Sequence, residues 1–287
     1  MKQVTIISGK GGTGKTTVTG AFAALASNLV LADCDVDAAD LHLIIKPTIR
    51  KKEVFHGLSF ASVDLEKCTD CLRCVNSCVF DAISEDISIQ YSSCEGCGVC
   101  HYVCPVDAIS MKKRDSGEIY TSDTRFGPMI HARLYTAEEA SGKLVTMVRN
   151  KAEELALSEK KDLVLIDGPP GIGCPVISAI TGVDLVVIVT EPTFSGIHDL
   201  KRVGQVAKHF GIPSSVIINK SDINKEMTNE IISYCKDVRI PLIGTIPYDK
   251  TETAAMIAEK TIPEFYKESV VNHITHCWNG LLALLDQ

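Results

Sequence analysis

Short, continuously apolar runs alternate with longer segments of helical periodicity along most of the chain. Runs that are apolar throughout are typical of strands buried on both faces, as in a parallel sheet covered by helices. The expected strands are Lys2–Ser8, Leu29–Asp33, Leu163–Asp167, Leu185–Thr190, Ser215–Asn219 and Pro241–Pro247, and the expected helices are Thr16–Ala26, Gly142–Glu159 and Ser195–Phe210. The pattern predicts an α/β fold with a mostly parallel sheet and helices on both faces.

The alternation breaks off between Ser62 and Lys112. This stretch has little continuous apolar sequence and holds eight of the twelve cysteines. In a long chain, clustered cysteines indicate metal or redox chemistry more than disulfides. We therefore expect residues 1–61 and 113–287 to form the two parts of one α/β domain, and residues 62–112 to form an inserted module.

The inserted stretch repeats itself at an offset of 26 residues. The sequence "DAIS" occurs at 81–84 and again at 107–110, and a run of four cysteines recurs at the same offset. The matched pairs are Cys68 and Cys94, Cys71 and Cys97, Cys74 and Cys100, and Cys78 and Cys104. Eight identities at one offset predict that the module consists of two copies of one half-domain.

Charge and hydropathy narrow the class of protein. The net charge is -7 and no basic stretch stands out, which excludes a broad nucleic-acid footprint. No apolar run approaches the ~20 residues that span a bilayer, and the first residues do not resemble a signal peptide. The amphipathic segment Val270–Leu285 lacks Lys and Arg, so we expect core packing rather than membrane binding. The expectation is a cytoplasmic protein.

A glycine-rich loop with the sequence "GKGGTGKT" joins the first expected strand to the first expected helix. It matches the pattern G-x-x-x-x-G-K-[ST], in which backbone N–H groups and a helix N-terminus surround phosphate oxygens. Lys15 is expected to reach the β- and γ-phosphates, and the Thr16 hydroxyl to hold Mg²⁺. The residues expected around the nucleotide are Gly11, Gly12, Thr13, Gly14, Lys15, Thr16 and Thr17.

The form "KGGTGKTT", with Lys10 near the front of the loop, resembles the deviant Walker A motif of the MinD/ParA/Mrp ATPases and the nitrogenase iron protein. In that family the first lysine crosses a dimer interface to the partner's nucleotide. The resemblance therefore implies that the chain is an ATP-dependent homodimer and that Lys10 acts in trans. Without the family, an exposed loop lysine would be the simpler interpretation.

The same resemblance assigns two switch regions. Asp35 matches the aspartate that orients the attacking water, and Asp33 matches one near Mg²⁺, although aspartates often follow strands for ordinary reasons. Asp167, in "LVLIDGPPG", would bind the Mg²⁺ shell through water, and the Gly171 N–H would sense the γ-phosphate. For the base, Asn219 of "NKSD" could read adenine, and prolines near Pro247 would line it.

The spacing C-x2-C-x2-C-x3-C, present twice, is the bacterial ferredoxin run and implies two [4Fe–4S] clusters. In two-cluster ferredoxins the fourth cysteine of each run completes the other cluster. One cluster is therefore expected on Cys68, Cys71, Cys74 and Cys104, and the other on Cys94, Cys97, Cys100 and Cys78. Zinc is the alternative, but its sites favour paired C-x2-C knuckles with a spacer, which this spacing fits poorly.

Four cysteines lie outside the module. Cys174 follows the second switch in "GIGCP", near where the nitrogenase iron protein carries a cluster ligand, so a transient cluster, a redox thiol and simple packing all stay open. Packing is the expectation for Cys34, Cys235 and Cys277. The segment around His131 and Glu139 is similar to MinD-like ATPases with an inserted ferredoxin domain, and either residue could touch a metal site or a partner subunit.

The combined expectation is a Mg-ATP-hydrolysing homodimer in which nucleotide state gates electron transfer through two [4Fe–4S] clusters to an unnamed redox partner. Alternatives are an iron–sulfur cluster carrier or scaffold of the Mrp type and a MinD-like positioning ATPase with a structural ferredoxin domain. A synthetase of amidotransferase type shares the fold, but nothing in the sequence marks a glutaminase site.

Overall fold

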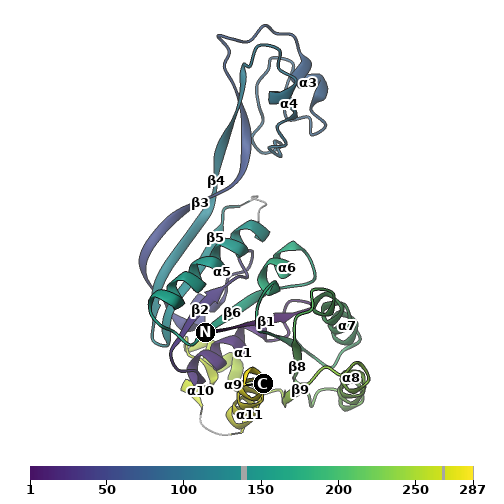
Figure 1. The fold of residues 1–287 in the computed structure, drawn as a ribbon. Coiled ribbons are helices and arrows are strands. Elements are labelled where there is room, and N and C mark those ends of the chain that lie inside the picture. Colours follow the sequence, from purple (N-terminus) through teal and green to yellow (C-terminus); the bar gives the residue numbers. More distant parts are fainter. Residues whose placement is uncertain (137–140, 267–268, 287) are drawn as a thin grey trace. The chain divides into compact units, whose positions relative to one another are not determined.

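A parallel-sheet core organises the computed structural model, which describes residues 1–136, 141–266 and 269–286. Its sheet has nine strands in the order β3-β4-β5-β2-β6-β1-β7-β8-β9 (Figure 1). The strands are β1 Lys2–Ser8, β2 Leu29–Asp33, β3 Thr48–Val63, β4 Ile109–Thr124, β5 Gly127–Leu134, β6 Leu163–Pro170, β7 Leu185–Thr190, β8 Ser214–Asn219 and β9 Leu242–Ile246. The pairs from β5–β2 through β8–β9 are parallel, which confirms the predicted fold class.

Helices follow most of these strands. They are α1 Lys15–Leu25, α2 Leu41–Ile45, α3 Arg73–Ser77, α4 Val99–Tyr102, α5 Ser141–Ser158, α6 Cys174–Ile180, α7 Phe194–His209, α8 Lys225–Val238, α9 Thr251–Ile257, α10 Ile262–Phe265 and α11 Val270–Leu285. No helix among the described residues is long and apolar enough to cross a membrane.

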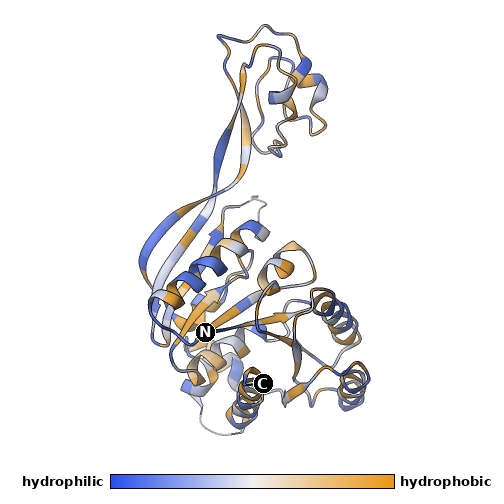
Figure 2. Cartoon of the chain, in the orientation of Figure 1, coloured by the Kyte–Doolittle hydropathy of each residue, from blue (hydrophilic) through white to orange (hydrophobic). Residues whose placement is uncertain are grey.

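The central strands are apolar because helices cover both of their faces. Every residue of β2 and β7 is buried, and Figure 2 shows the apolar residues gathered on the strands. The predicted role of α11 in core packing is confirmed, since Ile274, Trp278 and Leu281 are buried and the Trp278 ring lies 5.2 Å from that of Phe22. The packing of helices against the buried strands holds the strand ends, and the loops that follow them, in fixed positions.

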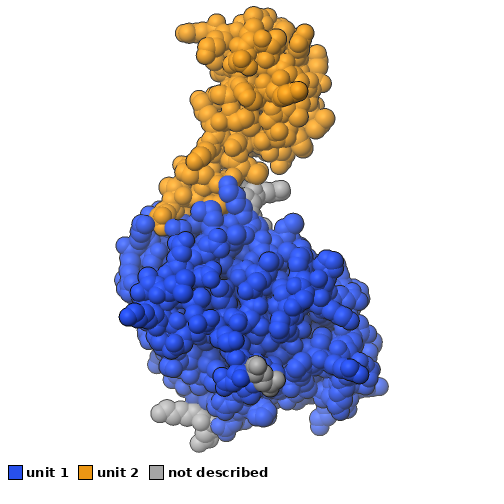
Figure 3. All heavy atoms as spheres, viewed as in Figure 1, with its two compact units in different colours: residues 1–52, 119–133, 141–287 blue, residues 53–118, 134–140 orange. Residues whose placement is uncertain are grey.

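Two compact units divide the chain, one of residues 1–52, 119–133 and 141–287 and the other of residues 53–118 and 134–140 (Figure 3). The alternation of strands and helices was expected to break off between Ser62 and Lys112, and two strands extend into the edges of that stretch, since β3 ends at Val63 and β4 begins at Ile109. Both strands contain many charged residues, and their buried positions are scattered among exposed and half-buried ones, so they lack the apolar run that marks a buried strand.

The second unit is built as two similar halves. Helix α3 and helix α4 begin 26 residues apart, and each follows a residue in left-handed conformation, Leu72 and Gly98. The Asp64 N–H donates to the Ala108 carbonyl at 2.7 Å, and 26 residues on the Gln90 N–H donates to the Ala82 carbonyl at 2.8 Å. Since 64 maps to 90 while 82 maps to 108, the operation that exchanges the halves also exchanges these two bonds.

Candidate nucleotide site and cysteine pockets

The glycine-rich loop leaves β1 and enters α1 where the order of strands reverses direction, the usual binding crevice of such sheets. Gly12 and Gly14 have φ of 80° and 88°, in the left-handed region that favours glycine. A Cβ on Gly14 would lie 2.2 Å from Nδ2 of Asn219. The loop therefore requires glycine at 14 for two reasons, its backbone angle and the close approach of β8.

Asp167 collects the polar side chains of the loop and of α1. Strand β6 places Asp167 opposite Ile6 of β1, three residues before Gly9. Its carboxylate accepts hydrogen bonds from Nζ of Lys15 at 2.9 Å, from Oγ1 of Thr16 at 2.8 Å and from Oγ1 of Thr19 at 2.9 Å. The structure thus brings together three of the residues to which the sequence assigned phosphate or Mg²⁺ contacts, and it adds Thr19.

Lys15 is a buried cation surrounded by carboxylates. Burial alone would lower the pKa of Lys15, but the charges of Asp167, Asp35 and Asp33 outweigh it and raise that pKa. Nζ of Lys15 lies 3.3 Å from Oδ2 of Asp35 as well as 2.9 Å from Asp167. The ammonium is therefore held in its charged form at the place where phosphate charge is expected.

Asp33 ends β2 beside Asp167, its register partner on β6. Oδ1 of Asp33 accepts from the Asp35 N–H at 3.1 Å, whereas Oδ2 is buried without a hydrogen-bond partner among the described residues. Burial first and the charge of Asp167 second raise the pKa of Asp33 well above its ordinary value. The unpartnered oxygen of Asp33 and the carboxylate of the neighbouring Asp167, to which Thr16 is bonded, are oxygen ligands of the kind that Mg²⁺ and its water shell take.

The second switch residue makes a contact that the sequence did not predict. Gly171 has φ of 96°, and its N–H donates to the Ser8 carbonyl at 2.9 Å. The N–H that was expected to sense the γ-phosphate is thus bonded to the strand that leads into the loop. To meet a phosphate it has to turn away from Ser8.

Two lysines are bound to one carboxylate outside the loop. Nζ of Lys10 lies 2.7 Å from Oε1 of Glu191 and donates to Oγ of Ser195 at 2.9 Å. Nζ of Lys220 donates to Oε2 of Glu191 and to the Gly12 carbonyl, each at 3.0 Å. These cations lower the pKa of Glu191 against the opposing effect of its burial. Glu191 and Lys220 are site residues that sequence reasoning missed.

Asn219 is almost fully buried, and both ends of its amide are engaged. Nδ2 donates to the Thr13 carbonyl at 2.9 Å, and Oδ1 accepts from the Lys220 N–H at 2.9 Å. In this arrangement Asn219 ties β8 to the phosphate loop, and one Nδ2 hydrogen stays outside these two bonds. Pro247, half-buried, directly follows β9, and Thr17 is half-buried on the first turn of α1.

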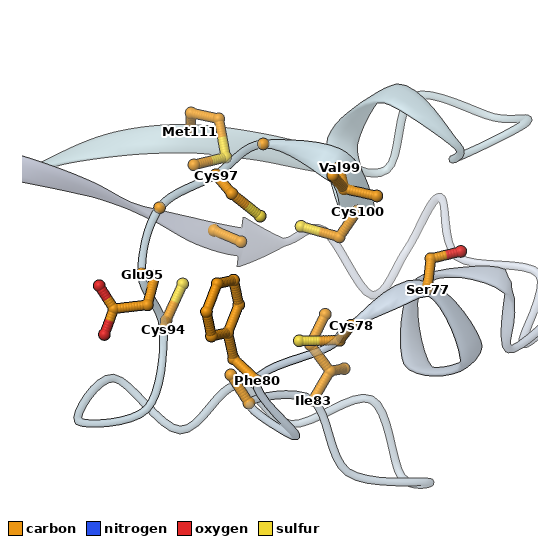
Figure 4. A pocket seen from close by; sticks show the side chains of 14 residues that line it. Ser77, Cys78, Phe80, Ile83, Cys94, Glu95, Cys97, Val99, Cys100 and Met111 are labelled. Atoms are coloured by element: carbon orange, nitrogen blue, oxygen red, sulfur yellow. The ribbon is translucent and has the colours of Figure 1, made fainter.

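The cysteines of the second unit line two pockets, four to each. The first pocket is lined by Cys68, Cys71, Cys74 and Cys104, and the second by Cys78, Cys94, Cys97 and Cys100. These are the two sets that the ferredoxin resemblance implied, with the fourth cysteine of each half in the pocket of the other. Figure 4 shows the four sulfur atoms of the second pocket pointing into a common space beside Phe80.

The donor chemistry of both pockets fits iron–sulfur clusters. Four thiols surround each pocket, and the Ala108 N–H donates to Sγ of Cys104 at 3.2 Å, the kind of contact that stabilises a thiolate. A Cβ on Gly96 would lie 2.1 Å from the Ser59 carbonyl, so the second half requires glycine there. Within the described residues, no three ligating side chains lie close enough together to hold a single metal ion.

The remaining cysteines differ in exposure. Cys34, Cys235 and Cys277 are buried, and burial raises the pKa of Cys235 to about 11 and that of Cys277 to about 12, as expected for packing residues. Cys174 is exposed at the start of α6, so the packing interpretation was wrong for it. His131 is bonded to Ser122 within β4 and β5, and Glu139 lies outside the described residues.

A scan against protein families matches residues 4–262 to the CobQ/CobB/MinD/ParA nucleotide-binding domain. The chain belongs to this family. An uncharacterized protein of Methanocaldococcus jannaschii, MJ0578, is 37% identical over 264 residues, which are 91% of this chain and 89% of that protein. The relation therefore extends over nearly the whole of both chains.

Solved structures of the family agree in fold. The septum site-determining protein MinD of Pyrococcus horikoshii, described as a complex with Mg-ADP, superposes with a TM-score of 0.57 at 20% identity and covers 98% of this chain and 97% of its own. Another similarity covers only a short part of the chain. The pyruvate synthase subunit PorD of Methanothermobacter marburgensis is 41% identical over 51 residues, which are 18% of this chain and 63% of the subunit.

As a member of the CobQ/CobB/MinD/ParA family, the chain is a nucleotide-binding protein of the P-loop ATPase type. The glycine-rich loop from Gly9 to Thr16 and the carboxylate of Asp167 lie within the matched residues 4–262. The unit that carries the cysteines is the feature the family description does not mention.

Proposed function

We propose that the chain is a Mg-ATP-hydrolysing homodimer in which the state of the nucleotide controls electron transfer through two [4Fe–4S] clusters. The single observation that carries this proposal is the grouping of the eight module cysteines into two pockets of four, in a chain whose phosphate loop converges on Asp167. The similarity to a pyruvate synthase subunit supports the part of the proposal that concerns the cysteine module. The Mg-ADP complex of a MinD structure supports the part that concerns the nucleotide.

At the nucleotide, Lys15 binds the β- and γ-phosphate oxygens, since its ammonium is charged and lies at the first turn of the helix that follows the loop. Thr16, with Asp33 and Asp167 acting through water, holds Mg²⁺, which supplies charge neutralisation at the phosphates when bound. The Thr16 and Lys15 bonds to Asp167 are available to be exchanged for a metal and a phosphate. Hydrolysis then requires a positioned water.

Asp35 is the residue proposed to orient that water. It lies 3.3 Å from Lys15 and is largely buried, and burial raises the pKa of its carboxyl. A carboxylate of raised pKa accepts a proton more readily, which suits a group that orients water for attack. Lys10 is proposed to reach the nucleotide of the partner subunit.

In the cysteine unit, each pocket supplies four thiolates to one cluster, and a [4Fe–4S] cluster supplies one-electron redox chemistry when bound. This chain contributes the sulfur ligands, N–H donors such as Ala108, and apolar walls that include Phe80. Exposed Cys71 and Cys97 mark where each pocket comes nearest to solvent. Those sides are the proposed points of entry for a redox partner.

Coupling is proposed to run through the first switch, because residues 33–40 lead through α2 directly into β3. A bound γ-phosphate would order this segment, and loss of the phosphate after hydrolysis would release it. Either change would alter the conformation of β3, the strand that leads to the module. If the nucleotide shifts the reduction equilibrium of the clusters by some factor, thermodynamic linkage requires that reduction of the clusters changes nucleotide affinity by the same factor.

The test is to purify the protein anaerobically, quantify iron and sulfide, and measure ATP and ADP affinity in the oxidised and reduced states. The proposal expects both clusters and a change in the ratio of the two affinities on reduction. Zinc without sulfide would refute the cluster assignment. Identical affinities in both redox states would refute the coupling and leave a positioning ATPase with a structural ferredoxin unit.

A second candidate function is delivery of iron–sulfur clusters to apo-proteins, favoured by the exposure of Cys174. It expects a labile cluster in addition to those of the module. The Cys174→Ala variant should then bind less iron per dimer and transfer less to an apo-acceptor after reconstitution. Unchanged iron and unchanged transfer would exclude a carrier role through this residue.

A further inference from the structure

Thr19 is a fully buried residue of α1, and no step of the proposed hydrolysis uses its side chain. Its hydroxyl donates to Oδ1 of Asp167 at 2.9 Å and to the Lys15 carbonyl at 3.0 Å. We infer that Thr19 is a positioning residue for Mg²⁺, because it holds the Asp167 carboxylate in place after Lys15 and Thr16 have turned to the nucleotide. The inference rests on the proposed nucleotide site and adds one residue to the part that binds metal.

The backbone of Asp167 is fixed independently of its side chain. Strand β6 lies between β1 and β2, and Asp167 is opposite Ile6 on one side and Asp33 on the other. The Cys34 N–H also donates to the Asp167 carbonyl oxygen at 2.8 Å. Only the side-chain torsions of Asp167 therefore remain to be set, and the hydrogen-bond donors to its carboxylate set them.

Three side chains donate to this carboxylate, and the proposed function gives two of them another partner. Lys15 and Thr19 donate to Oδ1, whereas Thr16 donates to Oδ2. When the nucleotide binds, the Lys15 ammonium is proposed to move to phosphate and the Thr16 hydroxyl to Mg²⁺. Of the side-chain donors to Asp167 that the described residues supply, Thr19 is then the one that stays.

Asp167 needs such a donor because a second carboxylate lies beside it. Asp33 is its register partner on β2, and both side chains are fully buried. Two carboxylates at this depth repel each other, so an Asp167 side chain without a donor is expected to rotate away from the metal position. The bond from Thr19 opposes that rotation.

The Thr19 hydroxyl is itself held in place by its helix. A threonine in a helix can bond the carbonyl four residues earlier, and the bond to Lys15 fixes Thr19 in that rotamer. One hydroxyl proton serves both acceptors, and the Asp167 carboxylate takes the larger share because charge-assisted bonds are stronger. With Oδ1 occupied by Thr19, Oδ2 is the oxygen left for the proposed metal, on the side of Thr16.

Magnesium titrations of the full-length chain saturated with ADP, followed by calorimetry, test the inference. Thr19→Val keeps the shape of the side chain and removes the hydroxyl. Because outer-shell partners of metal ligands typically contribute roughly 10–100-fold to metal affinity, the Kd for Mg²⁺ should rise by about tenfold or more. The Kd for ADP measured in EDTA should change by less than about threefold, since the Lys15 ammonium stays in place to bind phosphate.

Three further variants separate metal positioning from general damage. Thr19→Ser retains the hydroxyl and should bind Mg²⁺ within about threefold of the wild type. Thr275→Val on α11 is the matched control, because Thr275 also bonds the carbonyl four residues earlier, that of Val271 at 2.8 Å, and this variant should change neither Kd. Thr19→Ala removes the hydroxyl in a smaller side chain and repeats the test if thermal unfolding shows that the valine variant does not fold.

The inference is overturned if Thr19→Val binds Mg²⁺ as tightly as the wild type, or if it weakens ADP by equal factors with Mg²⁺ and in EDTA. The second result would mean that Thr19 only supports the helix and its loop. A serine variant as weak as the valine variant would also overturn it, because the hydroxyl would then not be the cause. Failure of the proposed nucleotide site looks different, because the wild type then binds no Mg-ADP.

Discussion

Oε1 of Glu191 lies 2.7 Å from Nζ of Lys10 in the same chain. Lys10 is the residue proposed to act on a partner's nucleotide, so this intrachain ion pair has to break before Lys10 can cross an interface. The exposed fraction of the side chain is 32% for Lys10 and 14% for Glu191, so the pair is only partly shielded from water. Glu191 therefore restrains Lys10 at a modest free-energy cost to dimer formation.

Replacing Glu191 by Gln is expected to promote ATP-dependent dimerisation. Loss of a partly buried ion pair corresponds to about 1 kcal/mol, and each of the two subunits loses one, so the dimer dissociation constant should fall by about 30-fold. Sedimentation equilibrium with Mg-ATP measures it. Ser195→Ala removes the other Lys10 partner and leaves Lys220 bonded, so it should shift dimerisation in the same direction by a smaller factor. Weaker dimerisation in both variants would contradict this account.

Asp35→Asn is expected to lower the rate of ATP hydrolysis by about 100-fold or more, because the amide can no longer orient water as a carboxylate does. Affinity for Mg-ADP should change little, since Lys15 keeps its bond to Asp167. Steady-state kinetics and calorimetry on one preparation check both. The neighbouring exposed Asp37→Asn is the matched control and should hydrolyse ATP at the normal rate. Equal loss in both variants would remove Asp35 from its role.

Double substitutions in the cysteine unit test how the ligands are shared. Cys104→Ala alone should lower bound iron from about eight atoms per chain to about four. Adding Cys68→Ala should cause no further loss, because both residues line one pocket, whereas adding Cys94→Ala should abolish the remaining iron. Iron analysis and EPR of reduced protein follow this. The reverse result would mean that each half binds its own cluster.

His131 predicts a loss of stability at acidic pH. Burial, assisted by the charge of His42, lowers the pKa of His131 to about 4, so between pH 4 and about 6.5 the unfolded chain binds more protons than the folded one. This contribution to stability is complete above pH 6.5 and is lost as pH falls, by about 2 kcal/mol between pH 7 and 5. Urea unfolding of wild type and His131→Gln across this range measures it.

The His131→Gln variant should lose less stability than the wild type over the same pH interval, because glutamine does not titrate and can still bond Ser122. His276→Gln, an exposed position on α11, is the control and should follow the wild-type curve. A His131→Gln curve as steep as that of the wild type would show that other groups cause the acid sensitivity.

The sequence was sufficient wherever a local pattern determines local structure. Strands β1, β2 and β7 lie at the predicted residues because each contains a short apolar run that is buried. Sequence alone missed β3, β4 and β5, because polar and charged residues interrupt the apolar positions of these strands. It also missed Glu191, since the pairs from Glu191 to Lys10 and to Lys220 join distant segments, which no spacing rule connects.

The glycine loop, Asp167 and the cysteine spacing were found in advance because their chemistry imposes a fixed order of residue types. The amide of Asn219 could not be assigned that way. Its two bonds, to Thr13 and to the Lys220 N–H, depend on how β8 packs against the loop.

The crossed arrangement in the cysteine unit has a consequence for how such a chain can change over generations. Since Cys78 and Cys104 each line the pocket of the opposite half, an isolated half would be one ligand short and could not assemble a complete centre. Deletion or replacement of one half alone therefore removes cysteines from both pockets. The two halves are expected to be inherited, lost or replaced together.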